Sequence, residues 1–318
     1  MSQPIILLMR TISDDYLQTL KKAAQGYQLV TAEESATINL DDVEIIISWR
    51  DDLGNKILAS PTSQLKWVQV YSAGVDDLPL DKLKEKKILL SNASGVHGIP
   101  ISETVIGMLL SHYRGLHLAS INQLDNKWDN RIKVTELNGQ SLLIVGTGAI
   151  GRQLAKVATV LGVNVYGLNR SGYPLDDFIE TYPQADIDRV LPEMDIVINI
   201  LPLTSETHYF YDTDRFQLMK DGVVFINVGR GPSVNTASLI EACQSGKVGF
   251  AGIDVFEEEP LPVDNPLWQM ENVLITPHIS GKTTQYNARF FDILMDNLQE
   301  YLKRGQLVRN QVQIDQGY

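Results

Sequence analysis

The stretch from residue 141 to residue 151 constrains the fold more than any other part of the chain. It reads SLLIVGTGAIG, so an unbroken apolar run, 142–145, leads directly into Gly146, Gly148 and Gly151. A segment with the apolar periodicity of a helix follows at once. A buried strand, a glycine turn and a helix in immediate succession predict one unit of a parallel α/β sheet.

The spacing of these glycines, G-x-G-x-x-G, matches the fingerprint of dinucleotide-binding sheets. The first glycine allows the tight turn, the second lets the backbone approach a pyrophosphate, and the third lets the helix pack against the strand. The N–H groups at the helix start, which carry about half a positive charge, then face the phosphates. We expect Gly146, Thr147, Gly148, Ala149 and Ile150 to bind a dinucleotide, with a purely structural turn as the alternative.

The length and charge of the chain limit its class. A chain of 318 residues suggests about two domains, and 44% apolar with 21% charged residues is typical of packed cores. The net charge of -12 and the lack of a sustained basic stripe argue against a nucleic-acid partner or an acidic membrane surface.

Cysteine usage and the N-terminus point to a cytoplasmic protein. The single cysteine, Cys243, excludes an intramolecular disulfide and a cysteine-rich metal site, and we predict no metal centre. The N-terminus, MSQPIILLMR, has no basic region followed by a long apolar stretch, so it predicts a first strand rather than a signal peptide. No apolar run approaches the roughly 20 residues of a membrane span.

Two blocks of alternating strands and helices are predicted, which indicates an α/β fold with parallel sheets. The stretch 92–100, NASGVHGIP, separates the blocks because it is dense in Gly, Ser, Asn and Pro. A long helix is expected over 284–303, and 307–314 is expected to return to the first sheet. The predicted strands are 5–9, 43–49, 67–71 and 88–90 in the first block, and 142–145, 164–168, 195–201, 223–228, 249–255 and 273–276 in the second.

The residues after the second strand of the nucleotide-binding block discriminate between NAD and NADP. An NAD-binding domain usually carries Asp or Glu there, to hydrogen-bond the ribose hydroxyls. This chain has Asn169, Arg170 and Ser171 instead. A carboxylate would repel a 2′-phosphate, whereas a guanidinium and a hydroxyl would bind it. We predict NADP as the preferred cofactor over NAD. The alternative, if Arg170 is only a solvated surface residue, is that the protein uses both.

Reactive side chains follow three later strands of the same block. Arg230 lies in NVGRG, an acidic run, 257–259, lies in DVFEEEP, and His278 lies in TPHISG. Arg can hold a substrate carboxylate, His can protonate a carbonyl oxygen as a hydride arrives, and Glu can orient the imidazole. Because the carboxyl ends of parallel strands form the ligand-binding edge, this set predicts reduction of a 2-keto acid.

Each of these residues also has a structural interpretation. Arg230 could satisfy loop carbonyls, the acidic run could be a solvated surface, and His278 could cap a loop after its proline. The residues alone do not show which of the three glutamates turns inward.

In this order and spacing, the motifs resemble those of the D-isomer-specific 2-hydroxyacid dehydrogenases. The fingerprint, PLT, GRG, DVFEEEP and TPHISG carry the resemblance, which extends over YSAGVD, SETVIGMLL, NKW and ELNGQSLLIVG. It implies two flavodoxin/Rossmann-like parallel-sheet domains with the active site in the cleft between them. Residues 1–99 with 285–318 would bind the substrate, and 100–284 would bind the dinucleotide. The resemblance also implies D stereochemistry and a homodimer formed through the cofactor domain, where the apolar helix from Ile101 is available.

The resemblance also assigns roles to single residues. Glu259, which directly precedes the proline, would pair with the acid/base His278, and Arg230 would bind the substrate carboxylate together with the backbone amides of Ala73 and Gly74. The other implied cofactor contacts are Asp254, at the nicotinamide carboxamide, and Thr104, Pro202, Thr204, Val228 and Gly281.

The substrate stays open at this point. Glyoxylate, hydroxypyruvate, 3-phosphohydroxypyruvate and larger 2-keto acids all suit the same set of side chains. A nucleotide-sensing corepressor of the same fold and a phosphite dehydrogenase are the alternatives, since a fold alone does not establish an activity. The complete set of Arg230, Glu259 and His278 favours the 2-keto acid reductase.

Overall fold

The chain folds into two compact units. The computed structural model describes residues 3–75 and 77–314, so that Asp76 in the YSAGVD loop lies outside the described residues. One unit comprises residues 1–96 and 284–318, and the other comprises residues 97–283. The chain therefore passes from the first unit to the second within the stretch NASGVHGIP.

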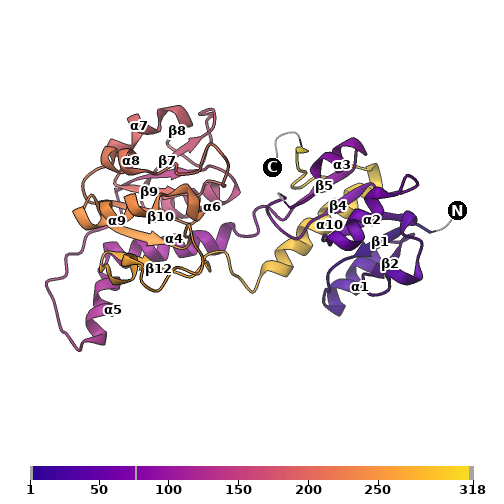
Figure 1. Ribbon diagram of the computed structural model, residues 1–318, viewed down its shortest axis with the longest axis horizontal. Coiled ribbons are helices and arrows are strands. Elements are labelled where there is room, and N and C mark those ends of the chain that lie inside the picture. Colours follow the sequence, from indigo (N-terminus) through magenta and orange to yellow (C-terminus); the bar gives the residue numbers. More distant parts are fainter. Residues whose placement is uncertain (1–2, 76, 315–318) are drawn as a thin grey trace. The chain divides into compact units, whose positions relative to one another are not determined.

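The first unit contains a five-stranded parallel sheet in the order β2-β1-β3-β4-β5 (Figure 1). Successive side chains of a strand point to opposite faces, so alternate residues of β1 enter two different cores. Ile6 and Leu8 share a cluster with residues of α10, while Ile5 and Leu7 share one with residues of α2. The elements are β1 (Ile5–Leu8), α1 (Asp14–Ala23), β2 (Gln28–Thr31), β3 (Val43–Ile47), α2 (Asp51–Ala59), β4 (Trp67–Gln69), α3 (Leu80–Glu85), β5 (Leu89–Ser91) and α10 (Tyr286–Arg304).

The C-terminal segment returns to this sheet, as predicted. The backbone N–H of Val312 donates to the Leu90 carbonyl at 2.8 Å, and Gln311 forms an antiparallel bridge with Ser91. The α10 helix packs its buried face, which includes Phe290 and Leu294, against the same sheet.

The second unit contains a seven-stranded parallel sheet in the order β12-β11-β10-β9-β6-β7-β8. The strand order reverses between β6 and β9, and the carboxyl ends at such a point form the usual ligand crevice. Residues of α4 and α6 share a core with one face of β6, and residues of α8 and α9 share a core with the other. The elements are α4 (Gly98–Tyr113), α5 (Leu116–Leu124), β6 (Ser141–Val145), α6 (Ala149–Val160), β7 (Asn164–Asn169), β8 (Glu180–Pro183), α7 (Ile187–Val190), β9 (Ile196–Asn199), α8 (Thr213–Leu218), β10 (Val223–Asn227), α9 (Thr236–Ser245), β11 (Val248–Ile253) and β12 (Val273–Ile275).

Two findings concern membranes and metals. Among the described residues, no helix combines the length and the apolar character that a membrane span needs. Within residues 3–75 and 77–314 there is also no group of three or more His, Cys, Asp or Glu side chains that could hold a metal ion. The lone Cys243 is buried, and this burial raises the pKa of its thiol to about 12.

The fingerprint turn shows why two of its glycines differ in importance. A Cβ on Gly151 would lie 2.2 Å from the Gly146 carbonyl oxygen, so α6 can pack against the turn only if this residue is glycine. A Cβ on Gly148 would meet no heavy atom within 4 Å. The packing role predicted for the third glycine is therefore present, and the space above the second is open.

We predict that alanine destabilises the protein at only one of these two positions. Gly151→Ala should lower the free energy of unfolding by about 1–3 kcal/mol, because the new methyl group forces helix and turn apart. The matched variant Gly148→Ala should change it by less than about 0.5 kcal/mol. Denaturant unfolding of the two variants beside the wild type measures this, and equal stability of Gly151→Ala and Gly148→Ala would contradict the packing argument.

Candidate active site

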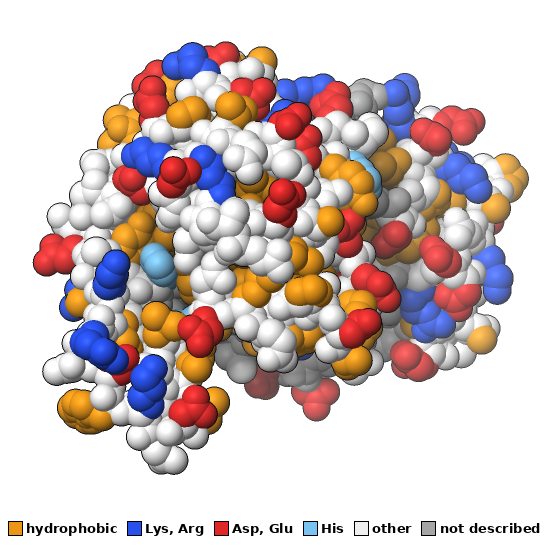
Figure 2. Space-filling model, turned by 60° about the vertical axis from the view of Figure 1, so that its left-hand side comes forward, with side chains coloured by type: hydrophobic (Ala, Val, Ile, Leu, Met, Phe, Trp, Pro, Cys, Tyr) orange, Lys and Arg blue, Asp and Glu red, His pale blue; other side chains and the backbone are white. Residues whose placement is uncertain are grey.

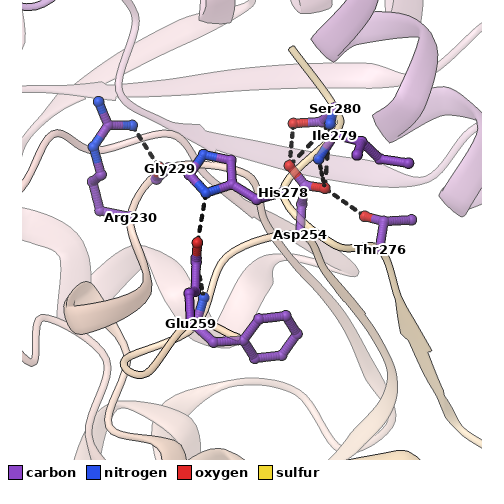
Figure 3. A network of polar contacts seen from close by, with 9 residues as sticks. Gly229, Arg230, Asp254, Glu259, Thr276, His278, Ile279 and Ser280 are labelled. Carbon is purple, nitrogen blue, oxygen red and sulfur yellow. Dashed lines mark hydrogen bonds and ion pairs between the residues drawn. The ribbon is translucent and has the colours of Figure 1, made fainter. Parts of the chain in front are cut away.

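Three adjacent strands bring the predicted catalytic residues to one edge of the second sheet. Strands β10, β11 and β12 are parallel neighbours, so their carboxyl ends lie side by side. Arg230 follows β10, Asp254 and Glu259 follow β11, and His278 follows β12 (Figure 3). The structure therefore assembles the set that the sequence predicted.

His278 and Glu259 form a pair at this edge. The His278 Nδ1 lies 2.7 Å from Glu259 Oε2, and the other carboxylate oxygen, Oε1, accepts a hydrogen bond from the Phe256 backbone N–H at 2.9 Å (Figure 3). An ionised carboxylate only accepts, so Nδ1 carries the hydrogen and Nε2 is left as the nitrogen that exchanges a proton. The His278 side chain is 56% exposed, which leaves it accessible to a ligand.

The loop that carries His278 is built around the Asp254 carboxylate. This group is fully buried and accepts hydrogen bonds from the Thr276 hydroxyl at 2.6 Å, the Ile279 N–H at 2.9 Å, and the N–H and hydroxyl of Ser280. The backbone N–H of His278 also donates to the Asp254 carbonyl at 2.9 Å. These contacts hold His278 at φ 52°, in the left-handed region that non-glycine residues seldom occupy.

Arg230 is placed by glycines on both sides. A Cβ on Gly231 would lie 1.7 Å from the Phe256 carbonyl oxygen, and one on Gly229 would lie 2.7 Å from the Leu201 carbonyl oxygen. The loop therefore passes so close to two other backbone segments that only glycine fits at positions 229 and 231. The Arg230 side chain is exposed, and its guanidinium donates to the Gly229 carbonyl at 2.9 Å.

A buried polar network beneath Arg230 was missed by the sequence reasoning. The Asn199 amide donates to Asn227 Oδ1 at 2.9 Å and to the Ser233 hydroxyl at 2.7 Å, and both partners donate in turn to the Arg230 carbonyl. Asn199 and Asn227 are paired in register on β9 and β10. The available signal was that two neighbouring apolar strands both end in Asn.

The three glutamates of the acidic run have different surroundings. Glu259 pairs with His278, whereas Glu257 accepts from the Thr236 N–H at 2.6 Å, where α9 begins. Burial acts to raise the pKa of the Glu257 carboxyl, but hydrogen bonds from Thr236 and Tyr209 outweigh it and lower this pKa. Glu258 is exposed. The structure thus resolves a choice that the residues alone left open.

The cofactor fingerprint lies at the carboxyl end of β6. Its Thr147 side chain is only 4% exposed and its hydroxyl has no hydrogen-bond partner among the described residues. At the end of β7, the Asn169 side chain accepts hydrogen bonds from the N–H groups of Ser171, Gly172 and Tyr173 and donates one to the Tyr173 carbonyl. The Asn169 amide thus shapes its own turn, and its predicted contact with the cofactor stays a prediction.

The comparison with known proteins agrees with this geometry. Residues 106–280 match the family model described as D-isomer specific 2-hydroxyacid dehydrogenase, NAD binding domain. The chain belongs to the D-isomer specific 2-hydroxyacid dehydrogenase family. The predicted family and α/β fold class are confirmed, and the protein is an NAD(P)-dependent oxidoreductase that acts on a CH–OH group.

Similar proteins cover nearly the whole chain. The glyoxylate/hydroxypyruvate reductase B of Escherichia coli K12 is 33% identical over 321 residues, which cover 97% of this chain and 97% of that protein. The phosphoglycerate dehydrogenase structure from Lactobacillus plantarum is 40% identical, with TM-score 0.59 and coverage of 97% and 99%. The structure of an NADPH-dependent glyoxylate/hydroxypyruvate reductase from Sinorhizobium meliloti, in complex with NADP and sulfate, is 26% identical, with TM-score 0.78 and coverage of 100% of both chains.

The remaining cofactor residues implied by the family resemblance lie on α4 and after β9, β10 and β12. The Thr104 hydroxyl donates to the Pro100 carbonyl at 3.0 Å within α4. In the loop after β9, the buried Thr207 hydroxyl donates to the Pro202 carbonyl at 2.6 Å and accepts from the Thr204 N–H at 2.7 Å. Val228 is buried after β10, and the Gly281 carbonyl lies 2.9 Å from His97 Nδ1.

Ala73 and Gly74, to which the family resemblance assigns substrate binding, lie in the first unit, whereas Arg230 lies in the second. Ala73 and Gly74 follow β4, where the Ala73 carbonyl accepts from the Asn92 amide at 2.8 Å and the Gly74 carbonyl accepts from the Ser72 hydroxyl at 2.6 Å. The proposed hydrogen bonds from the backbone N–H groups of Ala73 and Gly74 to the substrate carboxylate stay a prediction. The predicted contact of Asp254 with a nicotinamide also stays a prediction, and the carboxylate is buried in this structure.

We predict that Asp254→Asn loosens the His278 loop. The carboxamide keeps one acceptor oxygen and replaces the other with an NH2 group, so at least one of the donors from Thr276, Ile279 and Ser280 loses its acceptor. Leaving such a buried donor unsatisfied costs about 1–3 kcal/mol. Hydrogen exchange of the Ile279 and Ser280 amides should therefore quicken, while Asp264→Asn, at an exposed position, leaves it unchanged. Equal protection of these amides in Asp254→Asn and the wild type would contradict the role of the carboxylate.

Proposed function

We propose that the protein reduces a small 2-keto acid to its D-2-hydroxy acid, with NADPH preferred over NADH, as a cytoplasmic homodimer. The observation that carries the proposal is the Glu259–His278 pair at the same sheet edge as Arg230. Residues 97–283 would be the dinucleotide-binding domain, and residues 1–96 with 284–318 the substrate-binding domain.

The named relatives support a short substrate. The Escherichia coli and Sinorhizobium meliloti proteins are described as glyoxylate/hydroxypyruvate reductases, and the Lactobacillus plantarum protein as a phosphoglycerate dehydrogenase. We propose glyoxylate and hydroxypyruvate as the first substrates to assay, followed by 3-phosphohydroxypyruvate. All three present a carboxylate beside a carbonyl group, which is an aldehyde in glyoxylate and a ketone in the other two. A planar guanidinium and an imidazole can bind these two groups together.

The fingerprint turn fits a dinucleotide. Gly148 has open space where a side chain would be, and the buried Thr147 hydroxyl has no partner within the described part of the chain. A reduced nicotinamide bound to this unit would supply a hydride to the keto carbon. The residues that would hold the cofactor are Gly146, Thr147, Gly148, Ala149, Ile150, Asn169, Arg170, Ser171, Pro202, Thr204, Val228, Asp254, Gly281 and Thr104.

The chain's own side chains would perform the remaining chemistry. The Arg230 guanidinium would bind the substrate carboxylate and polarise the carbonyl, aided by the backbone amides of Ala73 and Gly74. His278 would donate the proton from Nε2 to the carbonyl oxygen. Glu259 would hold the ring through Nδ1, so that Nε2 can face the carbonyl oxygen.

We predict that His278→Ala lowers kcat by at least about a hundredfold and leaves the Kd of NADPH unchanged, since a positioned acid contributes about 10²–10⁴ in rate. Glu259→Gln should also lower kcat, because the ring loses its charged anchor. The matched control is Glu258→Gln, one residue away in the same acidic run and exposed. Steady-state rates with glyoxylate measure all three, and an unchanged rate in His278→Ala would overturn its role.

Exposed apolar side chains on α5 and the segment that follows it support the proposed homodimer. No residue of α5 is buried, and Leu116 is 53%, Leu124 84% and Trp128 95% exposed. Figure 2 shows hydrophobic side chains on the projection at the lower left. Such a patch favours a protein interface, and a second copy offers the same patch for a two-fold contact.

We predict that Leu124→Glu shifts the protein from dimer to monomer, because a charge in the centre of an apolar interface is costly to bury. The matched control is Val263→Glu, which changes another exposed apolar residue, 97% exposed, in the loop after β11. Light scattering after gel filtration measures the mass. A wild-type monomer, or an unchanged dimer in Leu124→Glu, would contradict the proposed interface.

A further inference from the structure

A hollow in the second unit lies beside the turn that follows β7. It has a volume of about 340 Å³ and is lined by Arg170, Gln184, Ala185, Glu206, Phe210 and Arg215. Strands β7 and β9 flank β6 on either side in the sheet, so the loops that carry Arg170 and Glu206 both border the fingerprint strand. The hollow therefore lies on the same edge of the sheet as the fingerprint turn.

The two arginines of the hollow differ in how firmly they are held. The Arg215 guanidinium stacks on the Phe210 ring at 4.1 Å, donates to the Phe210 carbonyl and contacts Asp188 at 3.2 Å. The Arg170 side chain is 76% exposed, and its ion pair with Glu206 is long, at 4.0 Å. Arg215 is thus fixed by three contacts with Phe210 and Asp188, whereas Arg170 is held only loosely by the Glu206 carboxylate.

The backbone at Glu206 belongs to a turn that is held by hydrogen bonds. The neighbouring Thr207 is 5% exposed and its hydroxyl bonds the Pro202 carbonyl and the Thr204 N–H, which fixes the turn 202–207. The Glu206 side chain is itself 68% exposed. A second anion that approached Arg170 would therefore meet a carboxylate beside the same guanidinium.

We infer that Glu206 is a specificity-determining residue that weakens the binding of the 2′-phosphate of NADP by competing for Arg170. The inference rests on the proposed preference for NADPH. A 2′-phosphate and the Glu206 carboxylate carry the same sign of charge, so each must share Arg170 with the other. NADH has a neutral 2′-hydroxyl there and meets no such repulsion, so Glu206 narrows the difference in affinity between the two cofactors.

The test is direct binding to the variant Glu206→Gln, which removes the charge and keeps the shape. The Kd of NADPH and of adenosine 2′,5′-bisphosphate should fall by about two- to fivefold, as expected for one exposed charge pair, while those of NADH and 5′-AMP stay the same. The gain should shrink as salt is raised, because exposed charges are screened. The matched control is Glu241→Gln, an exposed carboxylate on α9, which should change none of these constants.

A parallel titration of Arg170→Ala separates the two proposals. If Arg170→Ala weakens NADPH binding and Glu206→Gln leaves it unchanged, the inference about Glu206 is overturned and the NADPH preference stands. If the wild type binds NADH more tightly than NADPH and Arg170→Ala changes neither constant, the cofactor preference itself is wrong. Tighter NADPH binding in Glu206→Gln, with NADH unchanged, supports the inference.

Discussion

The buried Asp254 carboxylate organises the part of the second unit where the chemistry is proposed to occur. The carboxylate accepts hydrogen bonds from Thr276, Ile279 and Ser280, and the backbone carbonyl of Asp254 accepts one from the His278 N–H. A buried charge is tolerated only when such donors surround it, so carboxylate and loop depend on each other. The unusual backbone of His278 follows from this arrangement, and the imidazole then meets Glu259.

The order of the strands explains why one sheet edge can bind a dinucleotide and carry the reacting groups. The fingerprint follows β6 at the point where the order reverses, and Arg230, Glu259 and His278 follow β10, β11 and β12 on one side of that point. On the other side, β7 leads to Arg170. The proposed phosphate contacts and the proposed acid/base group therefore lie toward opposite ends of one edge, as an extended cofactor requires.

The strands that contain long apolar runs could be predicted from the sequence. The prediction missed β2 and β8, whose sequences QLVT and ETYP each contain a single buried residue and form edges of their sheets. Arg230 and His278 could be predicted as site residues because they follow strong strands. The hydrogen bonds of Asp254, Asn169 and Ser233 could not, since they depend on turns whose geometry no periodicity records. The choice of Glu259 over Glu257 needed the family resemblance or the structure.

The central claim is that this chain transfers a hydride to a 2-keto acid while His278 supplies the proton. Incubation with NADPH deuterated at C4 on the transferred face and with glyoxylate or hydroxypyruvate tests it most directly, with the product analysed by mass spectrometry and chiral chromatography. The account predicts one deuterium at C2 of the hydroxy acid, and hydroxypyruvate as substrate should give the D isomer. Tight NADPH binding with no deuterated product from either acid or from 3-phosphohydroxypyruvate would contradict it.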